Sequence, residues 1–204
     1  IGAAMMDGNS GKSLIKEVVK EAVEFRQEIG KLYKEFTAKD DWFFKPWNAE
    51  KVTDPKTKKE YNFEEAPIEL LTTEQDCWIM HPEDKWHGFA DLPENWAMLD
   101  PIKVSILAPG MGDDGELLEK GVPAALVSAY LAKYGIVPTR TTDFQVMFLF
   151  SMGITEGKWS TLVNVLLSFK KHYDNNTLLK DVLPELVAAH PEHYGEMGFH
   201  DLGE

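Results

Sequence analysis

The chain contains one stretch that decides its fold, in which short β-rich segments alternate with helical ones: KVSILA (103–108), GVPAALVSAYLAKY (121–134), IVPTR (136–140), QVMFLFS (145–151) and EGKWSTLVNVLLSFKKHYDN (156–175). The three short segments predict strands, because β-branched and aromatic residues are frequent in them. The two long segments predict helices, because their apolar residues recur at spacings of three and four. This order predicts one α+β module, with an antiparallel or mixed sheet that helices cover on one face.

A long helix is predicted ahead of this module. Apolar residues recur at helical spacing from Ile15 to Phe36 and form one stripe, while lysines and glutamates occupy the other faces. Asn9 or Ser10 can cap the start of this helix. The stripe predicts packing against a core rather than a coiled coil, because no heptad pattern continues beyond Phe36.

The segments around the module have weaker patterns. Residues 42–47 predict an aromatic strand that proline ends, and residues 48–60 predict a turn-rich surface connection. Residues 68–71 predict a further strand. Residues 178–190 predict a helix that ends before the next proline, although Pro184 is an unfavourable residue for its interior.

The composition is that of a soluble globular protein. The 204 residues are 44% hydrophobic and 27% charged, which allows one or two domains with a sizeable core. No apolar run approaches the roughly 18–20 residues of a membrane span, and no secretory signal is visible, so no membrane partner is predicted. The single cysteine, Cys77, excludes an internal disulfide framework and a multi-thiolate metal site, and it favours the reducing cytoplasm.

The net charge of −13 is unevenly distributed along the chain. Residues 1–60 hold 12 basic and 11 acidic side chains, residues 61–121 hold 3 and 14, and residues 122–204 hold 6 and 9. The acidic segment 61–121, with a net charge of −11, argues against nucleic-acid binding, which needs a basic surface. It is either a solvated surface that aids solubility or a contact surface whose repulsion falls as its carboxylates are protonated.

No complete catalytic constellation can be recognised in the chain. The glycine loop at 110–115 lacks the Lys-Ser/Thr ending of a phosphate-binding P-loop, and the NSGKS segment at 9–13 lacks the earlier glycine. The six histidines are scattered, and no Ser/His/Asp grouping has the sequence context of a nucleophile. From the residues alone we assign no catalytic, cofactor-binding or metal-binding residue.

Two polar segments are candidates for binding a small molecule. Trp86 and His87, in the segment WHGF (86–89), either anchor a packed loop or line a pocket. The link TRTTD (139–143) has more polar side chains than a tight hairpin needs. It is either a polar turn, in which Asp143 bonds to its own backbone, or a loop that contacts a polar substrate.

Short motifs that run in order through nearly the whole chain resemble the Orn/Lys/Arg decarboxylase family of fold-type I pyridoxal-phosphate enzymes. The motifs are GNSG (8–11), WFF (42–44), WHGF (86–89), LDPIKV (99–104), APGM (108–111), GVPA (121–124), GIVP (135–138) and FLFSMG (148–153). The resemblance implies a carboxy-lyase in which pyridoxal phosphate serves as the electron sink while carbon dioxide leaves a basic amino acid.

The resemblance also implies how much of such an enzyme the chain contains. Residues 1–40 correspond to the helix that leaves the large cofactor domain, residues 41–176 to the small α+β domain, and residues 177–204 to the start of the C-terminal domain or a helical tail. The family's Schiff-base lysine follows a Ser-x-His pattern, which does not occur in this chain. We therefore expect an internal piece of a longer enzyme, with the pyridoxal phosphate bound by residues outside it. The piece alone is expected to be inactive.

Within the family, the resemblance favours the arginine-specific members, which convert arginine to agmatine. Lysine- and ornithine-specific relatives have a glutamate where this chain has Thr139. A guanidinium needs a planar partner with several acceptors, so Asp143 is the candidate, with Thr139 making room. Trp86 and His87 complete the expected substrate-binding set. Two alternatives remain open: a lysine or ornithine decarboxylase of the same family, or a non-catalytic interaction or regulatory module with the same fold.

The resemblance further implies a cytoplasmic enzyme that serves acid resistance as a homodimer and a higher homo-oligomer. The acidic segment 61–121 offers a physical reason for assembly that depends on pH, because protonation removes repulsion between facing carboxylates. The shift toward larger oligomers is expected between about pH 7 and pH 5. The carboxylates expected to repel one another are Glu64, Glu65, Glu69, Glu74 and Asp76.

Overall fold

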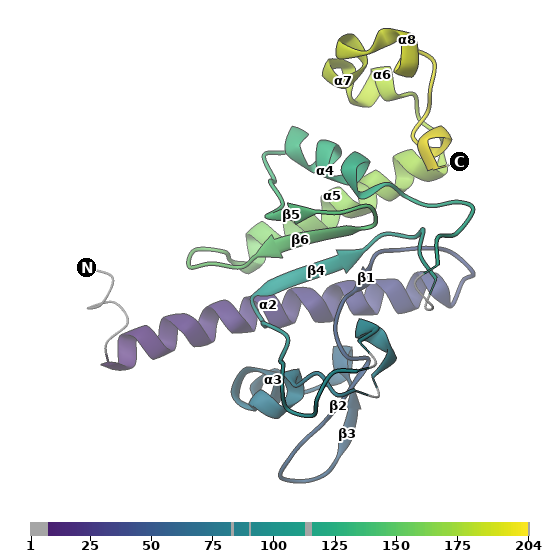
Figure 1. The fold of residues 1–204 in the computed structure, drawn as a ribbon. Coiled ribbons are helices and arrows are strands. Elements are labelled where there is room, and N and C mark those ends of the chain that lie inside the picture. Colours follow the sequence, from purple (N-terminus) through teal and green to yellow (C-terminus); the bar gives the residue numbers. More distant parts are fainter. Residues whose placement is uncertain (1–7, 83, 90, 113–115, 204) are drawn as a thin grey trace.

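The longest element of the protein is a single helix that crosses the molecule. The computed structural model describes residues 8–82, 84–89, 91–112 and 116–203. Helix α2 (Gly8–Thr37) runs across Figure 1 from one side of the molecule to the other, with further elements both above and below it, and it confirms the predicted long N-terminal helix. The N-cap predicted at Asn9 or Ser10 is wrong, because the backbone of both residues already lies within the helix.

A four-stranded antiparallel sheet forms the centre of the larger part of the fold. Its strands are, in spatial order, β1 (Lys45–Pro46), β4 (Lys103–Leu107), β6 (Gln145–Leu149) and β5 (Arg140–Thr141). In the central pair, Val104 lies opposite Phe148 and Ile106 lies opposite Val146. All four side chains are buried, and they share one face because successive residues of a strand point to opposite faces. The predicted α+β class with an antiparallel sheet is confirmed.

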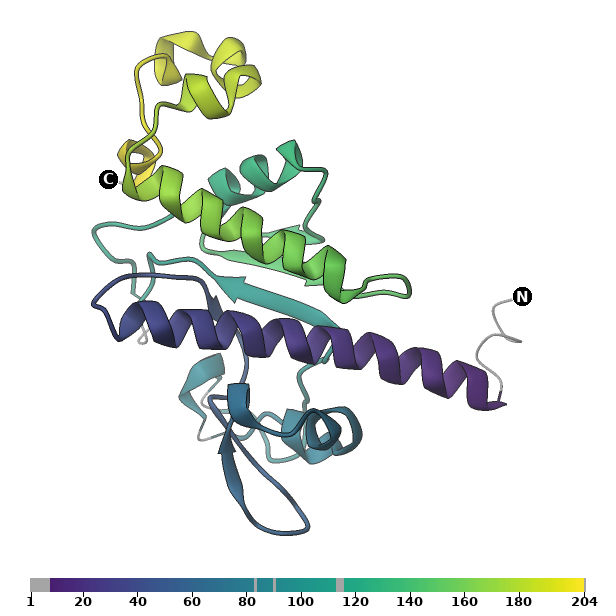
Figure 2. The ribbon, with the colours of Figure 1, turned by 180° about the vertical axis from the view of Figure 1, so that it is seen from behind.

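Three helices share one core with this face of the sheet: α2, α4 (Ala124–Lys133) and α5 (Glu156–Asp174). Figure 2 shows α5 lying across the sheet with α2 alongside it. The ring of Phe25 on α2 contacts three other aromatic rings, with centroids 6.2 Å from Phe148, 5.4 Å from Phe150 and 6.3 Å from Trp159. Buried aromatic pairs of this kind fix the helix against the sheet.

A second, smaller core lies on the other side of α2. It is built from strands β2 (Lys51–Thr53) and β3 (Glu60–Asn62), helix α3 (Ile68–Thr73) and the 3-10 helices η1 (Phe63–Glu65), η2 (Gln75–Trp78) and η3 (Lys85–His87). Val23 of α2 packs there with Phe63, Leu71 and Trp78. Because α2 gives Phe25 to the first core and Val23 to the second, it joins the two.

Residues 179–203 form four short elements that follow α5. They are α6 (Leu179–Val182), α7 (Pro184–Ala189), α8 (Pro191–Tyr194) and the 3-10 helix η4 (His200–Gly203). Figure 1 shows α6 to α8 above α4, at the edge of the molecule. Leu179 and Phe199 nevertheless belong to the main core, and the Phe199 ring contacts the rings of Tyr130 and Phe169. The domain boundary expected at residue 177 stays a prediction.

Two predicted elements differ in the structure, one in its type and one in its continuity. Residues 68–71, predicted as a strand, belong to helix α3, whose first helical hydrogen bond runs from the Leu71 N–H to the Pro67 carbonyl at 3.2 Å. The helix predicted at 178–190 is divided into α6 and α7. Pro184 has no N–H with which to continue α6, and it begins α7 instead.

The strand predicted at 136–140 pairs only at its end, in β5. The Ile136 N–H is bonded to the Leu131 carbonyl at the end of α4, 3.1 Å away, and Pro138 has no N–H, so neither residue can donate to the sheet. The aromatic segment 42–47 likewise pairs only in β1, and the connection predicted at 48–60 contains most of the β2–β3 hairpin.

A fully buried arginine connects α2 to both cores. The Arg26 guanidinium donates to four backbone carbonyls at 2.8–3.4 Å, those of Trp47, Asp100, Pro101 and Lys103. It also donates to the side-chain oxygen of Asn48 at 3.4 Å and lies over the Trp78 ring. Burial lowers the pKa of Arg26 to about 9, against the opposing effect of the Asp100 charge, so the group stays charged at neutral pH.

Replacing Arg26 by alanine should destabilise the fold, because it leaves several buried carbonyls without donors and opens a cavity. We expect a loss of about 3–4 kcal/mol in the free energy of unfolding. The Arg140→Ala variant is the matched control, since that side chain is exposed and its loss should cost less than about 0.5 kcal/mol. Urea unfolding of both variants measures the difference, and equal midpoints would contradict the role given to Arg26.

Candidate functional site

A cleft of about 720 Å³ lies where several separate parts of the chain meet. Its walls come from the end of α2, the connection at 41–48, η3, the loop after β4 and the turn between β5 and β6. The structure brings three of the four predicted substrate-binding residues, Trp86, His87 and Asp143, to this cleft. Thr139 is not among the residues that line it, and the assignment of all four to a substrate stays a prediction.

His87 is a packed anchor of its loop as well as part of the cleft wall. The residue is 7% exposed, and its Nε2 lies 2.8 Å from the His81 carbonyl while Nδ1 accepts the Phe89 N–H at 3.0 Å. The carbonyl requires Nε2 to carry the proton, so both ring nitrogens are occupied in the neutral form. His87 can therefore shape the cleft, but it has no free nitrogen with which to transfer a proton to a ligand.

Trp86 holds the same loop against the connection at 41–48. Its ring meets the Trp47 ring edge to face at 5.3 Å, and its carbonyl accepts the Trp47 indole N–H at 3.1 Å. The Trp86 indole N–H donates to the Asp84 carboxylate at 3.2 Å. These contacts give the cleft a rigid aromatic wall.

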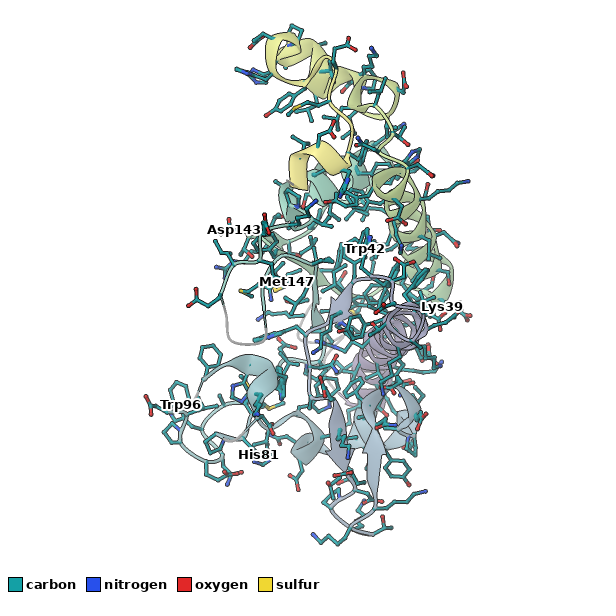
Figure 3. All side chains as sticks on the ribbon, turned by 90° about the vertical axis from the view of Figure 1, so that its right-hand side faces the viewer. Lys39, Trp42, His81, Trp96, Asp143 and Met147 are labelled. Carbon is teal, nitrogen blue, oxygen red and sulfur yellow. The ribbon has the colours of Figure 1, made fainter. Side chains whose placement is uncertain are left out.

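Asp143 lies in the turn before β6 and is held by its backbone. Its carbonyl accepts the Ala124 N–H at 2.8 Å, and the carbonyl of the next residue, Phe144, accepts the Ala108 N–H at 2.8 Å. Among the described residues, the exposed Asp143 carboxylate has no hydrogen-bond or ion-pair partner. Figure 3 shows Asp143 and Met147 on the side of the molecule away from α5. A free carboxylate at the edge of an aromatic cleft can accept a cationic group.

The structure adds a group of charged residues that the sequence analysis missed. Lys170 of α5 is almost completely buried, and its ammonium lies 2.8 Å from the Asp41 carboxylate and 2.6 Å from the Asp174 carboxylate. It also lies over the rings of Phe36 and Trp42. The Trp42 indole N–H donates to Asp174 at 2.8 Å. Since Asp41 and Trp42 line the cleft, Lys170 fixes one of its walls. The sequence does contain one sign that Lys170 is buried, because it lies on the apolar stripe of α5.

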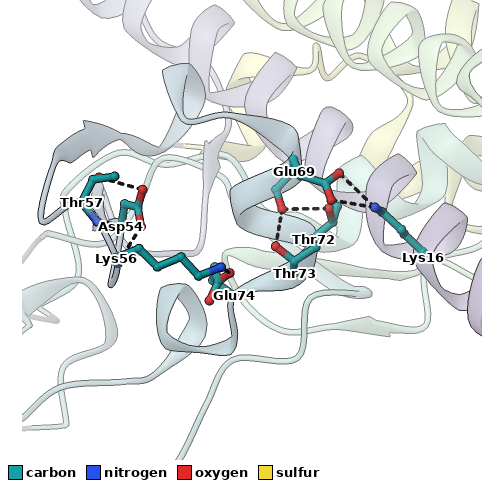
Figure 4. Close-up of polar contacts among 8 residues, drawn as sticks. All are labelled: Lys16, Asp54, Lys56, Thr57, Glu69, Thr72, Thr73 and Glu74. Atoms are coloured by element: carbon teal, nitrogen blue, oxygen red, sulfur yellow. Dashed lines mark hydrogen bonds and ion pairs between the residues drawn. The ribbon is translucent and has the colours of Figure 1, made fainter.

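The acidic segment 61–121 is partly neutralised by lysines from residues 1–60. Figure 4 shows Lys16 with Glu69 and Lys56 with Glu74. Lys34 forms a further ion pair with the buried Glu64. Three of the five carboxylates expected to repel one another therefore have lysine partners, which reduces the repulsion available to a pH-dependent assembly. Glu65 instead accepts from the Asn62 amide at 3.2 Å.

The fold agrees with the comparisons to known proteins. The family model described as Orn/Lys/Arg decarboxylase, major domain, matches residues 1–158, and the chain belongs to that family. The chain is 68% identical over all 204 residues to the biodegradative arginine decarboxylase of Escherichia coli K12. It is 40% identical over 204 residues to the lysine decarboxylase LdcA of Pseudomonas aeruginosa PAO1.

Solved structures of relatives have the same fold. The constitutive lysine decarboxylase of E. coli superposes on 98% of this chain with a TM-score of 0.79 and 39% sequence identity. This match covers 25% of the solved chain. Similarly, the chain spans 27% of the length of the E. coli arginine decarboxylase and 25% of that of LdcA.

The family implies pyridoxal phosphate, which bonds covalently to a lysine amine in its uncharged form. Two lysines line the cleft: the Lys45 ammonium is 3.0 Å from the Glu50 carboxylate, and Lys85 is exposed. The Lys45 ammonium is held in an ion pair and Lys85 lies at the surface, so neither is an amine enclosed within the cleft. The described cleft therefore does not fit the cofactor by itself.

No helix among the described residues is both long and apolar enough to cross a membrane. Within the same residues, no three histidine, cysteine, aspartate or glutamate side chains gather closely enough to hold a metal ion.

Replacing Lys170 by methionine should raise the pKa of Asp41. The hydrogen bond from Lys170 is the largest cause that holds this pKa below its ordinary value of 3.8, and the Trp42 N–H adds to it. Because folding lowers the pKa of Asp41, its ion pair with Lys170 stabilises the protein above about pH 4. This contribution is lost as pH falls through the pKa that Asp41 has in the folded state. NMR titration of the Asp41 carboxyl group measures the shift. Lys171→Met, on the exposed face of α5, is the control and should leave Asp41 unchanged.

Proposed function

We propose that this chain is part of a pyridoxal-phosphate-dependent carboxy-lyase that converts arginine to agmatine and carbon dioxide. The observation that carries the proposal is the difference in identity among relatives. The chain is 68% identical to an arginine decarboxylase of E. coli, 40% identical to a lysine decarboxylase and 29% identical to the constitutive ornithine decarboxylase of E. coli.

The chemistry of the cleft supports a guanidinium substrate. A guanidinium is planar, stays charged, stacks on aromatic rings and pairs with a carboxylate through two parallel hydrogen bonds. The cleft offers the aromatic walls of Trp47 and Trp86 and the unpaired carboxylate of Asp143. Asp41, the other aspartate among the described residues that line the cleft, is already engaged by Lys170. Asp143 is therefore the group we assign to the substrate, with Trp86 and His87 shaping the space around it and Thr139 leaving room.

The cofactor belongs to the remainder of the enzyme in this proposal. When bound, pyridoxal phosphate supplies the electron sink for the loss of carbon dioxide. This chain contributes a rigid wall and a substrate-binding carboxylate rather than the Schiff-base lysine. We further propose a cytoplasmic enzyme that acts in acid resistance and assembles as a homodimer and larger homo-oligomer, since the arginine-specific branch of the family implies both.

A direct test is an amine-product assay of the full-length protein that contains this chain. We expect agmatine from arginine, with kcat/KM at least about 100-fold above that for lysine or ornithine, since a site built for one hydrogen-bonding group discriminates strongly. A preference for lysine or ornithine would support the other substrates of the family. No amine from any of the three would favour the non-catalytic module.

Asp143→Ala in the same enzyme should remove the acceptor of the guanidinium. We expect kcat/KM for arginine to fall by an amount equivalent to about 2–4 kcal/mol, because the guanidinium would lose its charged acceptor in the complex of enzyme and substrate. Asp181→Ala, at an exposed position on α6 outside the cleft, is the matched control and should behave as wild type. Unchanged turnover of arginine by the Asp143 variant would remove this residue from the site.

A further inference from the structure

Residues 198–203, which we call the C-terminal strap, fold back onto the end of α5. The Asp201 carboxylate accepts the Gly198 N–H at 2.7 Å and the Asn176 side-chain amide at 2.8 Å. The amide oxygen of Asn176 accepts the His200 N–H at 2.9 Å. The Gly198 and Asn176 hydrogen bonds hold the pKa of Asp201 below its ordinary value, so a charged carboxylate closes the strap at neutral pH.

The strap meets Gly121 in a contact that leaves no room for a side chain at residue 203. The Gly203 carbonyl accepts the Gly121 N–H at 3.0 Å, and the Tyr173 hydroxyl donates to the Gly121 carbonyl at 2.8 Å. A Cβ atom at Gly203 would lie 2.0 Å from the Tyr173 hydroxyl oxygen and 2.1 Å from the Gly121 carbonyl oxygen. Any side chain at residue 203 must therefore displace either the strap or Gly121.

Gly121 in turn touches the turn that carries Asp143. A Cβ atom at Gly121 would lie 2.8 Å from the Phe144 ring and 2.7 Å from the Cα atom of Gly110. Three residues further along the chain, the Ala124 N–H donates to the Asp143 carbonyl at 2.8 Å. A displacement of Gly121 is thus transmitted to both residues of the turn through close contacts.

We propose that the C-terminal strap positions the Asp143 carboxylate for the guanidinium of the substrate, an inference that rests on the proposed function. The carboxylate itself has no partner among the described residues, so the backbone of its turn sets its position. That backbone is held by the Ala124 N–H on the Asp143 carbonyl and by the Ala108 N–H on the Phe144 carbonyl. Gly121 is three residues from Ala124 and packs against the Phe144 ring, so in this proposal its position affects the turn from both sides. Gly203 is therefore a positioning residue, and it acts through Gly121 rather than on the substrate.

The test uses the full-length holoenzyme and the variant Gly203→Ala. We expect KM for arginine to rise about tenfold with kcat within about twofold, because the lost interaction is one of binding. The matched control is Gly157→Ala at the other end of α5, where an added Cβ has no heavy atom within 4 Å. This control should keep the wild-type KM.

A double-mutant cycle separates positioning from a general loss of stability. If the strap acts through Asp143, Gly203→Ala should not raise KM further in an Asp143→Ala background, whereas unrelated effects would add. Should Gly203→Ala fail to fold, Asp201→Asn replaces it in the cycle, since it weakens the hydrogen bonds that close the strap without adding a side-chain clash.

The outcomes distinguish the two proposals. A wild-type enzyme that releases agmatine, with a raised KM in the strap variant and no additivity with Asp143→Ala, supports the strap. A wild-type enzyme that releases agmatine, with an unchanged KM in the strap variants or with additive effects, overturns the strap and leaves the proposed function intact. A wild-type enzyme that releases no agmatine overturns both.

Discussion

The buried guanidinium of Arg26 is the constraint on which the rest of the structure depends. A charge removed from water is stable only when its donors are satisfied, and among the residues that the structure describes no carboxylate is hydrogen-bonded to this one. Its partners are instead carbonyls at the start of β4 and a carbonyl and an amide oxygen at residues 47–48. All of these segments must be in place before the charge is satisfied. The arginine therefore makes the position of the central strand and that of the β1–β2 connection depend on each other.

This coupling also explains why the cleft has rigid walls. The Trp47 carbonyl accepts a hydrogen bond from the Arg26 guanidinium, and the Trp47 indole N–H donates to the Trp86 carbonyl. The aromatic wall is therefore connected directly to the buried charge. On another side, Lys170 orients Trp42 through Asp174. Two buried cations thus hold the segment between α2 and β2 from opposite ends. One uses neutral backbone acceptors, and the other uses carboxylates and aromatic rings.

The helices and central strands could be predicted from the sequence because apolar periodicity is a local property, and it holds for α2, α5, β4 and β6. The misassigned segments depend on where a single N–H is used. The Ile136 N–H donates to the Leu131 carbonyl at the end of α4, and Pro138 has no N–H. For the site, the family resemblance pointed to Trp86, His87 and Asp143, which share a cleft, but no spacing rule could show that distant segments meet there. Lys170 was missed although it lies on the apolar stripe of α5, because that position does not show which distant acceptors will surround its charge. Arg26 was missed because its acceptors likewise come from segments far along the chain.

The two edges of the main sheet have a consequence for solubility. β1 and β5 are each two residues long, and β1 contains Pro46, which has no N–H to offer a further strand. Long, flat edges are templates on which other chains add strands and begin to aggregate. Neither described edge of this sheet can extend in that way. Ordered association of copies at this sheet must then use complementary side-chain surfaces, which are open to control by charge, rather than continuous hydrogen bonding between backbones.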